Sequence, residues 1–305
     1  MNRRIVATRV IAVFCCLALL LPALFAADPI EFVPAPGFPQ VPAGVTLGKC
    51  SAVAIDSHNR IFVFHRGRTP ILCFDREGSF VRGWGDDAIQ SPHGIRIDSD
   101  DNIWTTDTGH HLVLKFSPQG KLLLALGTSD KPGDSHEQFN KPTDVAFGPA
   151  GEVYVSDGYG NNRIVQFDAR GKFAKTWGRG GKGPGEFNLP HAVRVDSRQQ
   201  ILVGDRENKR IQVFDRDGKV LAIWEGFAPY GLEIDQEGAV FVADAVAHRI
   251  VQLDADGRIV HSWGNEGSNP GEFKAPHMLA TNGDGSLFVA EVDGMRVQKF
   301  VRKRK

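Results

Sequence analysis

Short apolar runs that alternate with polar residues recur along most of the chain. Each unit opens with an alternating run, followed by a turn and an apolar run such as VYVSD at 153–157. A third run such as RIVQFD at 163–168 comes next, then an Asp-Gly type of turn and a fourth run that ends near Trp-Gly. Alternation of this kind is typical of half-buried β-strands, and Asp-Gly between two such runs indicates a hairpin. Each unit therefore predicts four short antiparallel strands.

The unit occurs six times along the chain. Four strands per unit, at a period of roughly 40 to 50 residues, are typical of a β-propeller blade. The sixth unit stops after its third strand, at Phe300. We expect residues 31–38 to supply the missing fourth strand, because pairing the two chain ends would remove the open edges of the first and last blades. The expected fold is a single all-β domain, a six-bladed β-propeller over residues 28–305.

The first 27 residues differ from the repeats. Three arginines (Arg3, Arg4 and Arg9) precede an apolar run from Val10 to Ala26. This is the layout of a secretory signal peptide, and the modest length of the run argues against a permanent membrane anchor. We therefore expect residues 1–27 to be a signal peptide and the protein to be secreted or periplasmic. An uncleaved anchor is the alternative.

Charge and cysteine content narrow the function classes. Lys plus Arg equals Asp plus Glu at 36 each, and without the three N-terminal arginines the counts become 33 and 36. Nucleic-acid-binding proteins carry a basic excess, so no nucleic-acid partner is expected. Signal cleavage would leave Cys50 and Cys73, which we place before the first strand and in the third strand of one blade. Because these strands are not neighbours, two buried thiols are expected rather than a disulfide.

Residues that recur in most units are explained by the construction of a blade. The second run ends in an acidic residue in five units: Asp107, Asp157, Asp205, Asp244 and Glu291. The third run opens with arginine in four units: Arg163, Arg210, Arg249 and Arg296. We expect hydrogen bonds from each acidic residue to the arginine or the backbone, which would fix the blade. Residues that break the repeat need another explanation.

One position near the start of each first strand, which we call the axial position, breaks the repeat in a regular way. From the first unit to the sixth it holds Ser51, His93, Thr143, His191, Tyr230 and His277. Histidine thus occupies alternate blades, which lie about 120° apart in a closed ring of six. We predict that the three imidazoles converge at one mouth of the central channel and hold a metal ion with an open coordination position. The alternative is that Pro-His is a favoured strand start, with each histidine capping backbone locally.

Three more residues depart from the repeat. Arg66 and Arg206 follow the second strand in blades one and four, which face each other across the ring. Two guanidinium groups that reach one channel would clamp a carboxylate or another oxyanion. Tyr159 lies in the corresponding loop of blade three, where a phenol beside a metal ion would be a proton acceptor. Surface arginines and a loop tyrosine are the alternatives.

Several segments resemble those of NHL-repeat proteins, and in particular of peptidyl-α-hydroxyglycine α-amidating lyase. They are FHRG at 64–67, PHGI at 92–95, SDGYGNNRIVQF at 156–167, FNLPHAV at 187–193, DRENKRIQVFD at 205–215 and APHML at 275–279. The resemblance extends over essentially the whole chain after the signal peptide. It implies a six-bladed propeller that cleaves a peptidyl-α-hydroxyglycine, a small-molecule or peptide substrate, into an amide and glyoxylate.

The resemblance also implies roles for single residues. His93, His191 and His277 would be zinc ligands, Tyr159 the general base, and Arg66 and Arg206 the groups that shape the substrate and the base. Two departures stand out. Gly160 replaces a cysteine, so a family disulfide is absent, and Met278 replaces an aspartate that helps to bind a structural calcium, which makes a calcium site doubtful.

Other functions fit parts of the sequence. A non-enzymatic NHL propeller outside the cytoplasm would bind a protein or a glycan, and its histidines would be incidental. Some NHL propellers bind RNA, but the expected export and the mildly acidic chain argue against that function. Propeller lactonases favour carboxylate-rich calcium sites over three histidines.

Overall fold

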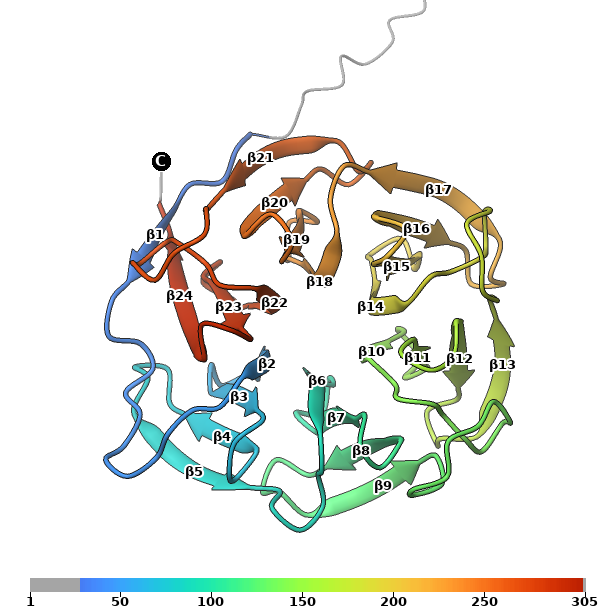
Figure 1. Cartoon of the computed structure of the whole chain (residues 1–305), viewed down its shortest axis with the longest axis horizontal. Coiled ribbons are helices and arrows are strands. Elements are labelled where there is room, and N and C mark those ends of the chain that lie inside the picture. Colours follow the sequence, from blue (N-terminus) through green and yellow to red (C-terminus); the bar gives the residue numbers. More distant parts are fainter. Residues whose placement is uncertain (1–27, 304–305) are drawn as a thin grey trace, which may run out of the picture.

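The computed structural model describes residues 28–303. In this part of the chain, 24 β-strands and no helix form six four-stranded antiparallel sheets. The sheets are arranged around a central opening (Figure 1). The predicted all-β, six-bladed propeller is therefore confirmed. Residues 1–27, predicted to be a signal peptide, lie outside the described residues, and within 28–303 no helix could cross a membrane.

Each blade runs from an innermost strand at the channel to an outermost strand at the rim. The innermost strands are β2 (Cys50–Ile55), β6 (Pro92–Ile97), β10 (Asp144–Phe147), β14 (Pro190–Val195), β18 (Pro229–Ile234) and β22 (Pro276–Thr281). The second strands are β3 (Ile61–His65), β7 (Ile103–Asp107), β11 (Val153–Asp157), β15 (Ile201–Asp205), β19 (Val240–Asp244) and β23 (Leu287–Glu291). The third strands are β4 (Ile71–Phe74), β8 (Leu112–Phe116), β12 (Arg163–Phe167), β16 (Arg210–Phe214), β20 (Arg249–Leu253) and β24 (Arg296–Arg302). The outermost strands are β5 (Phe80–Trp84), β9 (Leu122–Leu126), β13 (Phe173–Trp177), β17 (Val220–Glu225), β21 (Ile259–Trp263) and β1 (Phe32–Ala35).

The sixth blade takes its outermost strand from the beginning of the described chain. Strand β1 pairs antiparallel with β24, in a register that runs from Phe32 opposite Arg302 to Ala35 opposite Lys299. Figure 1 shows the blue strand β1 beside the red strand β24. This pairing joins the two ends of the described chain, so that every blade has four strands.

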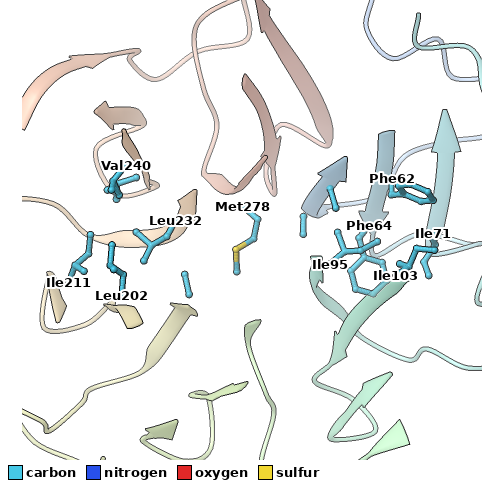
Figure 2. Packing of buried hydrophobic residues seen from close by; sticks show 14 of the residues in the cluster. Phe62, Phe64, Ile71, Ile95, Ile103, Leu202, Ile211, Leu232, Val240 and Met278 are labelled. Carbon is cyan, nitrogen blue, oxygen red and sulfur yellow. The ribbon is translucent and has the colours of Figure 1, made fainter. Parts of the chain in front are cut away.

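Burial decreases from the channel to the rim. Second strands such as β15 are buried at every residue, whereas outermost strands such as β9 expose Leu122 and Leu123. The largest apolar cluster spans several blades, and Figure 2 shows Met278 of β22 between Leu232 on one side and Ile95 on the other. Met278 is fully buried. Close packing of this kind fixes the innermost strands against one another.

Cys50 and Cys73 are separate, fully buried thiols, as predicted. Cys50 is the first residue of β2 and does not precede the strand, which is a small correction. Burial, with a smaller contribution from the charge of Glu291, raises the pKa of Cys50 to about 12. A thiol in this state is unreactive at neutral pH.

The recurrent acidic residues act as predicted. Four of them pair with the arginine of the next strand: Asp157–Arg163 at 2.9 Å, Asp205–Arg210 at 2.7 Å, Asp244–Arg249 at 3.1 Å and Glu291–Arg296 at 2.6 Å. In blade one, the equivalent position holds His65, whose Nδ1 accepts hydrogen bonds from the backbone of Gly48 (3.0 Å) and Gly67 (3.2 Å). The buried His65 is thus a structural substitute for aspartate in blade one.

Candidate metal centre and active site

Each axial histidine lies at a break in the strand register. In β14 the register shifts between Pro190 and Ala192, which leaves His191 without a cross-strand partner. The register shifts in the same way around His93 of β6 and His277 of β22. Such β-bulges redirect a side chain and are common beside active sites. The same shift occurs at Ser51 and Tyr230, so the bulge belongs to the blade, and histidine at the bulged position is what distinguishes the even blades.

The structure brings the three predicted histidines together. Nε2 of His93 lies 3.1 Å from Nε2 of His191, and one nitrogen of each ring lies within 4.8 Å of the others. The ring centroids are 4.7 to 4.9 Å apart. His93 and His191 are fully buried, and His277 is 4% exposed. The predicted alternation in sequence thus becomes a compact group of three buried rings.

The odd-numbered blades orient the imidazoles of the even-numbered blades. Nδ1 of each histidine lies 2.6 Å from a backbone carbonyl oxygen: His93 from Thr143, His191 from Tyr230 and His277 from Ser51. These three acceptors occupy the axial position in the odd blades. A carbonyl can only accept a hydrogen bond, so Nδ1 must carry the ring proton. Each Nε2 is then a bare lone pair that faces the other two.

Burial keeps these rings neutral. It lowers the pKa of His93 and His191 well below the usual range and that of His277 to about 3, while Arg66 and Arg206 act in the same direction on His93 and His277. Two unprotonated nitrogens 3.1 Å apart repel each other unless a cation lies between them. Tetrahedral zinc with ordinary Zn–N bonds holds its nitrogens about 3.3 Å apart. The group therefore fits a metal ion and could hold one.

Tyr159 lies over two of the histidines. Its hydroxyl oxygen is 3.1 Å from Nε2 of His93 and 3.2 Å from Nε2 of His191. The loop reaches this position because glycines flank the tyrosine: a Cβ on Gly158 would lie 1.9 Å from the carbonyl oxygen of Pro190, and one on Gly160 would lie 2.0 Å from the Asn140 side chain. A larger residue at Gly158 would collide with backbone and displace the loop, whereas at Gly160 the Asn140 side chain would have to move.

Arg206 is held in place beside Tyr159. Its Nη1 lies 3.5 Å from the Tyr159 hydroxyl, and its guanidinium carbon lies 4.6 Å from the ring centre of Tyr230. Nε and Nη2 contact Oε1 of Glu207 at 2.8 and 2.7 Å. Tyr230 and Glu207 were not identified from the sequence, although Tyr230 was visible as the blade-five residue of the axial position. Arg206 is therefore already paired with a carboxylate.

Arg66 has a different environment. Its Nε donates to the carbonyl oxygen of Pro92 at 3.1 Å. Among residues 28–303, Arg66 forms no ion pair with a carboxylate. Its Nη groups are thus available to an incoming oxyanion. The sequence predicted two equivalent arginines that clamp one anion, whereas the structure makes them unequal, because only Arg206 pairs with a carboxylate, that of Glu207.

Comparisons with known proteins agree with the repeat pattern. A family model for the NHL repeat matches residues 90–116, 139–167 and 187–214. Peptidyl-glycine alpha-amidating monooxygenase of Mus musculus is 40% identical over 205 residues, which are 56% of this chain and 21% of that protein. Peptidyl-alpha-hydroxyglycine alpha-amidating lyase 2 of Drosophila melanogaster is 32% identical over 211 residues, 59% of this chain and 51% of that protein.

A further relative and a solved structure are also similar to this chain. NHL repeat-containing protein 3 of Homo sapiens is 38% identical over 203 residues, 62% of this chain and 58% of that protein. The match thus spans about a fifth of the mouse monooxygenase and about half of the other two relatives. A streptogramin B lyase structure, 14% identical, has a TM-score of 0.64 over 90% of this chain and 98% of that one, which shows the fold alone. The chain thus contains NHL repeats and is similar in sequence to peptidyl-α-hydroxyglycine α-amidating lyases and to NHL repeat-containing protein 3.

Proposed function

We propose that this protein is a zinc-dependent lyase that cleaves the C–N bond of a peptidyl-α-hydroxyglycine, or of a related carbinolamide, to an amide and glyoxylate. The observation that carries the proposal is the group of bare Nε2 atoms with the Tyr159 hydroxyl within 3.2 Å of two of them. The similarity to relatives named as amidating lyases supports the reaction type. Three neutral imidazoles with an open position suit zinc.

The three histidines would hold the zinc ion through Nε2. Zinc bound there would supply Lewis acidity, which polarises the substrate hydroxyl and lowers its pKa. Tyr159, as a phenolate, would accept the hydroxyl proton. As the carbonyl of glyoxylate forms, the electron pair of the C–N bond passes to the amide nitrogen, which takes up a proton. No oxidant or further reactant is needed.

The two arginines would have different roles, one toward the substrate and one toward Tyr159. Arg66, whose Nη groups have no carboxylate partner among residues 28–303, would bind the substrate carboxylate. Arg206, held by Glu207 and Tyr230, would place its guanidinium group 3.5 Å from the Tyr159 hydroxyl and so orient the base toward the substrate. A small carboxylated carbinolamide would thus meet the metal, the base and the two arginines together.

The test combines metal analysis with a direct assay. Purified protein is analysed for its metal content, and glyoxylate release is measured from an N-acyl-α-hydroxyglycine. One zinc ion per chain with glyoxylate formation is expected. Zinc without turnover would retain the metal centre and reject this substrate class. A protein that takes up no metal even when zinc is supplied would overturn the enzyme proposal.

A non-enzymatic role as a protein- or glycan-binding module is the second candidate. The similarity to NHL repeat-containing protein 3, whose name specifies no reaction, supports it. In that case the protein would bind its partner equally well with and without metal. Loss of partner binding on removal of zinc would argue against this candidate.

We also propose that residues 1–27 direct export and are then removed. The arginine-rich start and the apolar run support this proposal. The mass of the protein recovered from outside the cytoplasm tests it. A chain that keeps residues 1–27 would support a membrane anchor.

A further inference from the structure

Beyond the histidines, the channel contains a second buried polar group, which we call the ion-pair belt: Arg96, Asp144, Arg194 and Glu233. Three residues after the axial position, the six blades carry Ala54, Arg96, Ala146, Arg194, Glu233 and Ala280. Arg96 and Arg194 lie on the histidine strands β6 and β14, while Asp144 and Glu233 lie on the neighbouring innermost strands β10 and β18. A pocket of about 220 Å³ is lined by Arg96, Arg194 and Glu233.

Every charge in the belt has a partner. Nε and Nη2 of Arg96 donate to the two carboxylate oxygens of Asp144 at 3.1 and 3.0 Å. Nη1 of Arg194 donates to Oδ2 of Asp144 at 3.0 Å, while its Nε and Nη2 donate to Glu233 at 3.1 Å. Asp144 is fully buried, and the side chains of Arg96 and Arg194 are only 8 and 10% exposed. Asp144 is the residue that joins the two arginines.

The belt is bonded to all three strands that carry histidines. Arg96 follows His93 on β6, and its Nη1 donates to the carbonyl oxygen of Leu279 on β22 at 3.0 Å. Its Nη2 contacts the sulfur of Met278, the residue next to His277, at 3.5 Å. On β14, two residues after His191, the backbone N–H of Val193 donates to Asp144 at 3.2 Å. Strands β6, β14 and β22 are therefore cross-linked within three residues of their imidazoles.

We propose that the ion-pair belt sets the spacing of the three histidine strands, and that Asp144 is its central positioning residue for the metal. The inference rests on the metal centre of the proposed function. Ligands must be held close to their ideal metal distances, and groups that orient ligands typically contribute ten- to a hundredfold in affinity. The belt would position the ligands by holding the backbone of their strands, whereas the odd-blade carbonyls orient each ring through its Nδ1.

The test compares two aspartates. Asp144→Asn removes the belt's central charge, while Asp244→Asn removes an equally buried carboxylate, paired with Arg249 at 3.1 Å, away from the belt. Cobalt(II) affinity and the visible spectrum of bound cobalt are measured for both variants and for wild type, together with the melting temperature of each metal-free protein. Both variants should have a lower melting temperature than wild type. Only Asp144→Asn should weaken cobalt binding, by about ten- to a hundredfold, and alter the spectrum.

Each result has a distinct meaning. Wild-type affinity and spectrum in folded Asp144→Asn would overturn the belt proposal while leaving the metal centre intact. Equal weakening in both variants would also overturn it, because the effect would then follow stability alone. If Asp144→Asn does not fold, Glu233→Gln, which leaves the Arg96–Asp144 pair intact, should weaken binding by a smaller factor; unchanged affinity there overturns the proposal. Wild-type protein that binds no cobalt would overturn the metal centre, and the belt proposal with it.

Discussion

The two buried polar groups of the channel differ in one respect: one is fully satisfied, and the other only in part, because the Tyr159 hydroxyl can donate to one Nε2 at a time. The ion-pair belt contains two guanidinium groups and two carboxyl groups, and each guanidinium group donates to a carboxyl oxygen. The histidine group contains three neutral rings whose Nε2 lone pairs face one another at distances down to 3.1 Å. The two groups share strands β6 and β14, on which Arg96 and Arg194 each follow the histidine by three residues. Self-sufficient polar groups stabilise or position a structure, whereas unsatisfied ones indicate a missing ligand.

A second contrast lies between odd and even blades. The even blades supply imidazoles at the axial position, and the odd blades supply carbonyl oxygens at the same position. One repeat position therefore provides both the candidate ligands and the groups that orient them. Side-chain identity matters in the even blades, while the backbone matters in the odd blades. This explains why Ser51, Thr143 and Tyr230 can differ so widely.

The largest effect should come from His191→Ala, which breaks the unsatisfied group. Loss of one of three ligands should weaken zinc binding on the order of a thousandfold, measured by competition with a chelator. No apolar core residue is removed, so the β-sheet circular dichroism should stay unchanged. His136→Ala, at an exposed histidine that belongs to no candidate metal group of the described residues, is the control and should bind zinc normally. Collapse of the β-sheet signal in His191→Ala would show that the histidine is structural.

Tyr159→Phe should separate chemistry from metal binding. The variant lacks the proton acceptor but keeps the ring, so glyoxylate release should fall by about a hundredfold or more while zinc affinity stays near wild type. Tyr230→Phe is the matched control, because Arg206 lies over the ring of Tyr230 and that ring is kept. Turnover in Tyr159→Phe equal to that in Tyr230→Phe would remove Tyr159 as the base.

The contrast between paired and unpaired groups can also be tested with arginines. Arg66 has no carboxylate partner among residues 28–303, whereas Arg96 and Arg194 of the belt do. Arg66→Gln should raise KM about tenfold or more with a smaller change in kcat, because a charged hydrogen bond to the substrate carboxylate is lost. Arg206→Gln should instead lower mainly kcat. Steady-state kinetics of both variants decide, and a reversed pattern would exchange their roles.

The sequence predicted the fold because the repeat acts as its own control. The same comparison across blades isolated His93, His191 and His277, since no requirement of blade construction explains histidine in alternate blades. The same comparison, applied three residues after the axial position, would also have found the belt. Three blades have alanine there and the other three have a charged residue. Asp144 gives a comparable signal one residue after the axial position, where four other blades have alanine or glycine.

Other features were not predictable from residue types. The β-bulges depend on the register between two strands, which the alternation pattern does not determine at its ends. The pairing of Arg206 with Glu207 depends on side-chain geometry, so two arginines that look equivalent in sequence acquire different roles. His65 occupies the position of a structural aspartate, and only the geometry shows that its Nδ1 accepts the backbone hydrogen bonds there.

The smallest predicted effect concerns pH, and its sign should be opposite at the two polar groups. Burial lowers the pKa of His277 from 6.5 to about 3, so below pH 6.5 the unfolded chain binds a proton that the folded chain does not. The free energy of unfolding therefore falls on acidification from pH 6.5. Burial raises the pKa of Glu233 from 4.5 to about 7, so there the folded chain holds the extra proton and stability falls as pH rises from 4.5 to 7.

Two variants of the metal-free protein separate these contributions. Urea unfolding between pH 5 and 6.5 should give His277→Gln a weaker acid destabilisation than wild type, and Glu233→Gln a stronger one. Each difference should approach about 1.4 kcal/mol per pH unit, which corresponds to one proton. If the free energy of unfolding depends on pH in both variants as it does in wild type, neither group titrates abnormally in the folded protein. Opposite deviations from wild type would show that the same channel holds two abnormal groups. His277 resists protonation, and Glu233 resists ionisation, on strands that the belt connects.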